Sequence, residues 1–137
     1  MIDRSFVDAN VCIALLQGPT HVHHQAALGM FRRVAAGEAE LFVAPTVLVE
    51  LTWYLEERLA WPRTRIRDEV IRFLAADGMT AIDGEVSMMA LRFFGADRRI
   101  DFVDAHVAAA AMVIGPPTVA SFDRDFDRIE GITRIAS

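Results

Sequence analysis

The sequence predicts an α/β fold, namely a three-layer α/β/α arrangement with a central, mostly parallel sheet. Short runs with β propensity alternate along the 137 residues with longer segments whose apolar residues recur at helical spacing. This alternation is typical of parallel strands joined by right-handed helical crossovers. The length fits a single domain over residues 1–137, and the 53% hydrophobic content supplies enough apolar surface for its core.

The first part of the chain is predicted to form one strand and two helices. Residues 4–7 are a short β-prone run, and the helical pattern that follows ends at Gly18-Pro19. Apolar residues recur at helical spacing over residues 21–36, and Gly37 ends that segment.

The middle of the chain continues the same alternation. Residues 41–44 form the second predicted strand. Thr46 is the expected N-cap of the next helix, which carries Glu50 one turn further on. Pro62 separates that helix from an amphipathic helix over residues 65–76.

The last part of the chain adds further strands and helices. Residues 79–82 form a third short strand, and residues 85–94 have helical periodicity. The alanine-rich segment 101–114 gives the clearest helix. Residues 118–121 form a fourth strand, and residues 133–135 form an edge strand near the C-terminus.

Four carboxylates stand inside or at the end of apolar stretches, where an unpaired charge is unfavourable. They are Asp8, Glu50, Asp104 and Asp123. Asp8 follows the first predicted strand and Asp123 the fourth, so both lie at one sheet edge if these strands are neighbours. Glu50 and Asp104 lie in the first turns of helices that can start at that edge. The sequence therefore predicts that the four acids converge on a divalent cation.

The predicted chemistry is metal-dependent phosphodiester hydrolysis. Hard oxygen ligands suit Mg²⁺, or Mn²⁺ in its place, and the chain lacks a histidine and cysteine set with zinc spacing. The net charge of −5 argues against bulk electrostatic binding of nucleic acid, so a nucleic-acid contact has to be local or metal-mediated. All 14 basic residues are arginine, which excludes mechanisms that need a catalytic lysine, including those of receiver domains and related phosphatases.

These segments together resemble those of the PIN-domain ribonucleases, and within them the VapC-like toxins of bacterial toxin–antitoxin pairs. The resemblance covers essentially the whole chain. Its anchors are Val7-Asp8-Ala9-Asn10, Glu50 in the helix that begins at Pro45-Thr46, the segment from Asp104 to Ala110, and the segment from Ser121 to Phe126. The implied activity is Mg²⁺-dependent endonucleolytic cleavage of RNA.

The resemblance also implies roles for individual residues. Asp8, Glu50 and Asp104 match the three invariant acids of the family, and Asp123 matches its more variable fourth. The metal ligands it implies are Asp8, Asp104 and Asp123. Four further residues have possible supporting roles, namely Asn10, Ser121, Asp101 and Asp125. Asp125 and Asp101 compete with Asp123 for the fourth position, and Asp101 is alternatively the N-cap of its helix.

The expected partners follow from the same resemblance. They are an RNA substrate, a cognate antitoxin protein and a second copy of the chain in a homodimer, with no membrane. The alternative function is a non-catalytic PIN-like module that binds another protein. A single cysteine, Cys12, and the lack of a long apolar segment favour a cytoplasmic location.

A group of arginines on or near the predicted helix 65–76 has two interpretations. They can contact RNA phosphates, or they can form a solvated face paired with Asp68 and Glu69, which we favour. The four residues are Arg63, Arg65, Arg67 and Arg72.

Overall fold

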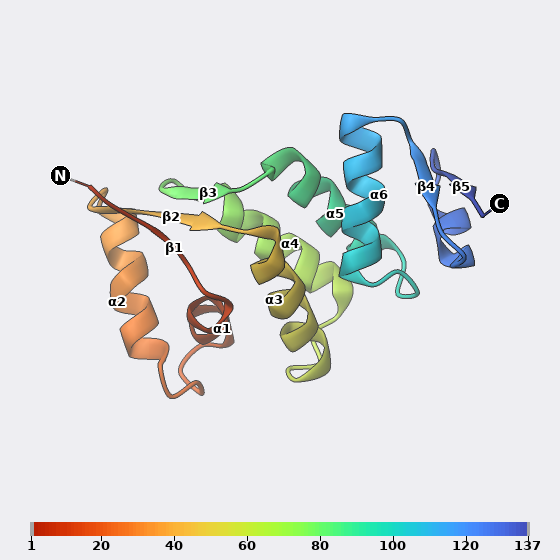
Figure 1. Ribbon diagram of the computed structural model, residues 1–137. Helices are drawn as coiled ribbons and strands as arrows, with labels where there is room; N and C mark the ends of the chain where they lie inside the picture. The colour runs from red at the N-terminus through yellow and green to blue at the C-terminus, as the bar shows by residue number, and fades with distance from the viewer. Residues whose placement is uncertain (1, 137) are drawn as a thin grey trace.

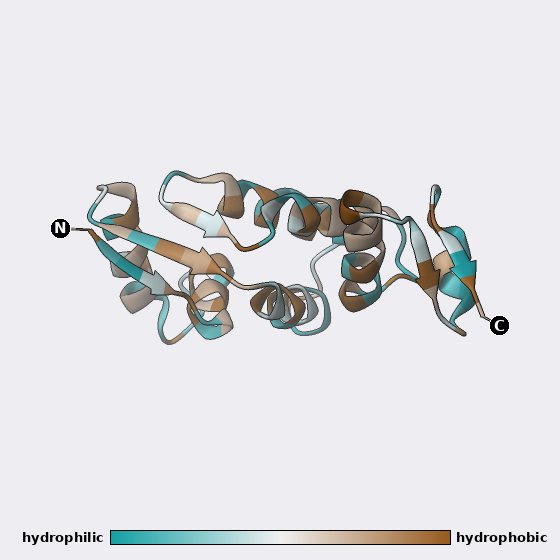
Figure 2. Cartoon of the chain, turned by 45° about the horizontal axis from the view of Figure 1, so that its top comes forward, coloured by the Kyte–Doolittle hydropathy of each residue, from teal (hydrophilic) through white to brown (hydrophobic). Residues whose placement is uncertain are grey.

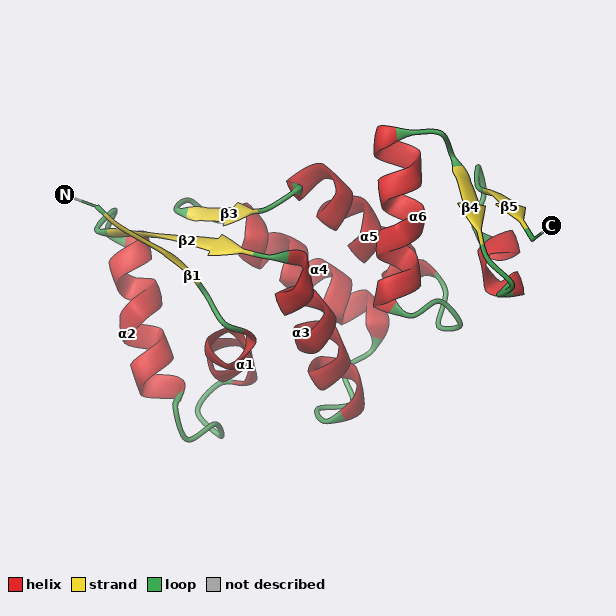
Figure 3. Cartoon of the chain, in the orientation of Figure 1, coloured by secondary structure: helices red, strands yellow, loops and turns green. Residues whose placement is uncertain are grey.

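All the described strands pair in parallel, and they form two separate sheets. The computed structural model describes residues 2–136. β1 (Asp3–Phe6), β2 (Ala39–Val43) and β3 (Met79–Ala81) form a three-stranded parallel sheet in the order β1-β2-β3. β4 (Thr118–Ala120) and β5 (Thr133–Ile135) form a two-stranded parallel sheet. Figure 3 shows the two groups of strands in yellow.

Helices alternate with these strands, which confirms the predicted α/β class and is consistent with a three-layer α/β/α fold. The helices are α1 (Ala9–Gln17), α2 (His24–Ala35), α3 (Pro45–Glu57), α4 (Arg63–Ala75), α5 (Gly84–Ala96), α6 (Phe102–Ile114) and the 3₁₀ helix η1 (Arg124–Arg128). In the described part of the chain, no helix has both the length and the apolar character needed to cross a membrane.

Several helix boundaries differ from the prediction. Ala44, rather than Thr46, is the N-cap of α3, because Pro45 occupies the first helical position, where its fixed φ suits the helix and its missing N–H is not needed. α2 begins at His24 and not at residue 21, and α4 begins at Arg63, two residues early. The helix η1 was not predicted, because its residues lack helical apolar periodicity.

The two sheets lie at opposite ends of an elongated molecule (Figures 1 and 2). β1 and β4 are therefore not neighbours, and the sheet-edge arrangement considered for Asp8 and Asp123 is not found within one chain. Helices α3 to α6 occupy the space between the sheets (Figure 1).

The core is continuous through these central helices. α5 and α6 pack extensively on each other, α5 also packs on α4, and α6 contacts α3. Leu51, Ile66, Leu91 and Ala105 are completely buried within this packing. Because α5 and α6 share so much of the core, the start of α6 is fixed relative to α3 and α4.

A buried arginine fixes the loop between α5 and α6. The Arg63 side chain is only 9% exposed, and its Nε donates to Glu56 Oε2 at 2.6 Å. Its Nη1 donates to the carbonyl oxygens of Phe94, Asp97 and Ile100. Arg63 thus satisfies the carbonyl groups of the segment that leads directly into α6.

The variant Arg63→Met is expected to lower the free energy of unfolding by about 2–3 kcal/mol, because it leaves Glu56 and three carbonyl groups without their donor. Urea denaturation measures this loss. Arg92→Met is the matched control, since Arg92 is exposed on α5 and is expected to change stability by less than about 0.5 kcal/mol. Equal effects of the two substitutions would contradict the anchoring role of Arg63.

Candidate active site

Two aspartates stand at the start of α6. Asp101 is the N-cap of this helix, and its Oδ1 accepts a hydrogen bond from the backbone N–H of Asp104 at 2.8 Å. Of the two roles considered for Asp101, the N-cap is therefore confirmed. Asp104 is half-buried in the first turn, with its backbone held by Asp101.

Two further aspartates stand in the turn that follows β4. The carboxylate of Asp123 accepts a hydrogen bond from the N–H of Asp125 at 2.8 Å, which makes Asp123 the N-cap of η1. The Oγ of Ser121 accepts from the N–H of Asp123 at 3.0 Å. Ser121 therefore shapes the turn that carries Asp123 and Asp125.

These four aspartates are close enough to act on one another, and we call them the α6 acid cluster: Asp101, Asp104, Asp123 and Asp125. Burial raises the pKa of Asp104 above its ordinary value, and the negative charges of Asp101, Asp123 and Asp125 raise it further. None of the four forms an ion pair with a basic side chain of residues 2–136. The cluster therefore carries negative charge that no ion pair within residues 2–136 neutralises.

The neighbouring Asp127 differs from the cluster in this respect. Its carboxylate forms an ion pair with Arg134 at 3.0 Å, and the hydrogen bond from Arg134 lowers the pKa of Asp127. Arg134 also donates to the carbonyl oxygen of Ser121 at 3.2 Å. Asp127 and Arg134 thus hold the turn after β4, whereas the cluster aspartates form no ion pair among residues 2–136.

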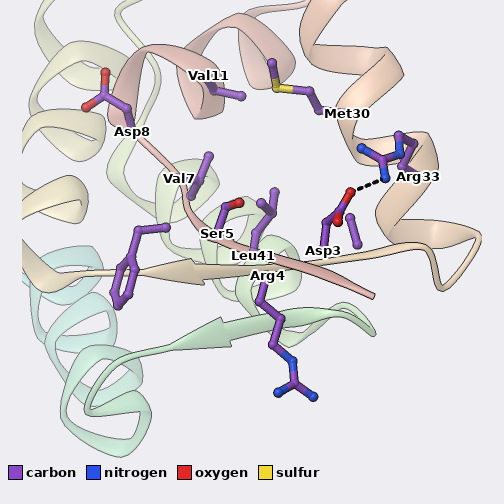
Figure 4. Close-up of a pocket in the computed structure, with 11 residues that line it drawn as sticks. Asp3, Arg4, Ser5, Val7, Asp8, Val11, Met30, Arg33 and Leu41 are labelled. Carbon is purple, nitrogen blue, oxygen red and sulfur yellow. Dashed lines mark hydrogen bonds and ion pairs between the residues drawn. The ribbon is translucent and has the colours of Figure 1, made fainter. Parts of the chain in front are cut away.

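Asp8 and Glu50 lie outside this cluster. Asp8 is exposed between β1 and α1, where Figure 4 shows its carboxylate turned away from the ion pair of Asp3 and Arg33. Burial, helped by the charge of Asp8, raises the pKa of the Cys12 thiol to about 12. Glu50 is exposed on α3. Neither acid contributes to the raised pKa of Asp104.

The structure thus brings Asp104 and Asp123 together, but it does not bring Asp8 and Glu50 to them within one chain. Asn10, expected to support the first acid, lies at the start of α1 and helps to line a pocket between α1 and α2. Within residues 2–136, no three side chains of histidine, cysteine, aspartate or glutamate lie together as a potential metal site. The roles of the predicted site residues therefore stay predictions.

The donor chemistry of the cluster suits Mg²⁺ or Mn²⁺, because its free side-chain donors are all carboxylate oxygens. Its unneutralised charge also favours a cation. The arrangement within a single chain is nevertheless incomplete, since the third predicted ligand, Asp8, follows β1 in the other sheet.

Sequence comparison identifies the family. The model of the PIN domain matches residues 5–132, which is nearly the entire chain. The chain belongs to the PIN-domain family. PIN domains are generally nucleases, so membership supports a phosphodiester hydrolase. A search of curated proteins found no match to this PIN domain.

Sequence reasoning missed two residues that position the site. Arg63 and Glu56 hold the loop before α6, and Arg63 is not part of the solvated face to which it was assigned. For Arg65 and Arg67 that interpretation is confirmed, because they pair with Glu69 and Asp68. The only available signal for Arg63 was its place directly after Pro62.

The raised pKa of Asp104 predicts a pH-dependent gain in stability when its charge is removed. Folding disfavours the ionised form, so Asp104 lowers stability as the pH rises through its folded-state pKa. In metal-free protein at pH 7, Asp104→Asn should raise the free energy of unfolding by about 0.5 kcal/mol, a small value because solvent screens the cluster. The gain should vanish below about pH 4, where Asp104 is protonated in both states.

Asp127→Asn is the matched control in the same region. Because Arg134 lowers the pKa of Asp127, this substitution should reduce stability at pH 7, and the loss should fade as the pH falls from the ordinary aspartate value through the lowered folded-state pKa. Urea denaturation at several pH values measures both effects. A loss of stability at pH 7 in Asp104→Asn would contradict the repulsion within the cluster.

Proposed function

We propose that this PIN domain is a magnesium-dependent endoribonuclease and the toxin of a toxin–antitoxin pair. The observation that carries the proposal is the family match over residues 5–132, joined to an acid cluster that forms no ion pair within the described residues. The proposed catalytic residues are Asp8, Glu50, Asp104 and Asp123. Of these, Asp8, Asp104 and Asp123 are the proposed metal ligands, and Mn²⁺ can replace Mg²⁺.

The proposed roles follow from the chemistry of the side chains. Asp104 and Asp123 offer carboxylate oxygens from α6 and from the turn after β4, while Asp101 and Ser121 hold those two segments in place. A bound Mg²⁺ would polarise the scissile phosphate and stabilise the developing negative charge. Without a cation, the cluster would repel a phosphate group, so RNA binding and metal binding are expected to be coupled.

The proposed partner is an antitoxin protein with basic side chains. A protein with a net charge of −5 has little general affinity for nucleic acid, and its unpaired carboxylates are complementary to arginine or lysine. An antitoxin segment that places such a residue against the α6 acid cluster would occupy the position of the cation. Inhibition and metal binding would then be mutually exclusive.

One observation favours the second candidate, a non-catalytic PIN-like module that binds protein. In a single chain Asp8 and Glu50 lie outside the α6 acid cluster, and the part of the chain that is described contains no complete metal-binding group. A chain that stays in this arrangement would have only part of the proposed catalytic set.

The activity is tested with purified protein, structured RNA and either Mg²⁺ or Mn²⁺. We expect endonucleolytic cleavage that stops when EDTA is added. Asp8→Asn, Asp104→Asn and Asp123→Asn should each reduce the rate by more than about 100-fold, because each removes a group acting on the developing charge. Gel analysis of end-labelled RNA measures the rates.

Asp68→Asn is the control, because Asp68 pairs with Arg67 on the exposed face of α4 and should keep the wild-type rate. Circular dichroism checks that every variant is folded. A wild-type protein that binds Mn²⁺ but cleaves none of a broad panel of RNAs would support the binding module instead.

A further inference from the structure

The sheet formed by β1, β2 and β3 is incomplete at the edge of β1. β1 pairs only with β2 in the described chain, and all four of its residues are exposed. The N–H groups of Asp3 and Val7 donate toward β2, so the alternation of a parallel ladder turns the N–H and C=O of Arg4 and Phe6 toward the free edge. The residues of β1 also line a surface pocket of about 570 Å³ (Figure 4).

One face of this sheet is also uncovered. The pocket includes Met30 and Arg33, which places α2 on the face that carries Ser5 and Leu41. Phe6 and Phe42 are register partners on the opposite face, with ring centroids 5.4 Å apart, and Phe6 is 68% exposed. Parallel sheets are normally covered on both faces, so the exposure of this apolar pair to solvent is unfavourable.

The C-terminal part of the chain also contains a strand with an unpaired edge. β4 pairs only with β5 among the described strands. The N–H of Ser121 donates to Ile135 and the C=O of Pro117 accepts from Thr133, so the backbone groups of Thr118 and Ala120 point to the free edge.

Along α6, next to β4, an apolar stripe is also exposed. Val103, Val107 and Ile114 lie on one side of the helix and are 51%, 43% and 77% exposed. Figure 2 shows α6 as largely hydrophobic. At one end of the chain, β1 has an unpaired edge next to an uncovered sheet face. At the other end, β4 has an unpaired edge next to the exposed apolar stripe of α6.

Within one chain these two surfaces are kept apart. β4 follows α6 after only Gly115-Pro116-Pro117, which spans at most about 14 Å. α6 is itself held by its packing on α5 and α3, and its leading loop is held by Arg63. For β4 to reach β1 of its own chain, this packing and the Arg63 hydrogen bonds would have to break. A second copy can present β4 with all of these contacts intact.

We propose that two copies of the chain exchange these surfaces reciprocally. β4 of each copy adds to the free edge of β1 of the other as a parallel strand, and the exposed stripe of α6 covers Phe6 and Phe42. The exchange continues one sheet across the two chains as β3-β2-β1-β4-β5. It closes by two-fold symmetry, so no edge of β1 or β4 is left for further association.

The backbone groups restrict the register of this pairing. A parallel ladder between the free groups of Arg4 and Phe6 and those of Thr118 and Ala120 places Ser5 beside either Thr118 or Ala120. In both registers Phe6 shares a face with Val119, which is the buried residue of β4. The same face is the one that α6 would cover.

The exchange would also complete the acid site, a consequence that rests on the proposed function. Asp8 follows β1 and Asp123 follows β4, so parallel pairing brings Asp8 of one copy to the end of the sheet that carries Asp123 and Asp104 of the other. Each dimer would then contain two composite sites, each made by two chains.

Cross-linking between variants that each carry one added cysteine tests the exchange without any need for activity. Chains with Ser5→Cys are co-expressed with chains with Thr118→Cys, and separately with chains with Ala120→Cys, and are treated with a short bis-maleimide. Cys12 is completely buried, so the wild-type chain is the unreactive background. We expect a covalent pair of the two different chains in one of the two mixtures.

The single-chain double variants Ser5→Cys/Thr118→Cys and Ser5→Cys/Ala120→Cys give the decisive contrast. A bridge inside one chain, at monomer mass, would show that β4 folds back onto its own β1 and would overturn the proposal. The absence of any bridge in all four samples would overturn it as well.

The stability of the dimer provides a second measurement. Phe6→Glu should raise the dimer dissociation constant at least about tenfold in analytical ultracentrifugation, because Phe6 would be buried only in the dimer. Val22→Glu is the matched control, since Val22 is 87% exposed in the segment before α2, away from either surface. A monomeric wild-type protein, or equal effects of both substitutions, would overturn the exchange.

Activity then separates this proposal from the proposed function. Co-expressed Asp8→Asn and Asp104→Asn chains form mixed dimers with one intact composite site, so about a quarter of the wild-type activity should return. An active wild-type protein without such rescue would overturn the composite site. A cross-linked dimer whose wild-type form cleaves no RNA would leave the exchange intact and remove only the nuclease.

Discussion

A parallel sheet is normally covered on both faces, and its exposed strand edges tend to pair with other strands. The rest of this structure depends on how these two requirements are met. Among the described strands, β1 and β4 each have one paired and one unpaired edge, and the exposed Phe6 and the α6 stripe lie beside those edges. The packing of α5 on α4 and α6, together with the Arg63 hydrogen bonds, holds the two edges at opposite ends of the chain. Strand pairing and helix packing therefore cannot both be completed without a second copy or a large rearrangement.

The acidic residues of the proposed site are also divided between the two ends of the chain. Asp101 and Asp123 use their carboxylates to cap α6 and η1, and the charges of both also act on Asp104. Burial raises the pKa of Asp104, and repulsion from these charges raises it further. A cation, or a basic side chain of an inhibitor, would relieve this repulsion. Asp8 stands at the end of the other sheet, where its charge acts on Cys12 instead.

The sequence was sufficient for the fold class, because helical and strand periodicities alternate clearly and the apolar residues mark each element. It also grouped Asp104 and Asp123, but together with Asp8 and Glu50, which the single chain keeps apart from them, and it gave the N-cap as one of two roles for Asp101. It could not show that the sheet is divided, because strand propensity does not say which strands pair. The role of Arg63 could not be predicted either, because its partners are backbone carbonyl groups of residues 94–100. Every residue has such a group, so the sequence does not indicate which ones accept a hydrogen bond.

In the proposed dimer, Asp8 of one copy and Asp104 of the other belong to the same metal site although they stand in different parts of the chain. Calorimetric titration of Mn²⁺ into the wild-type protein and the Asp8→Asn and Asp104→Asn variants tests this shared site most directly. If both acids contact one ion, each substitution should weaken Mn²⁺ binding by at least about tenfold. Weaker binding in Asp104→Asn together with unchanged affinity in Asp8→Asn would contradict the shared site.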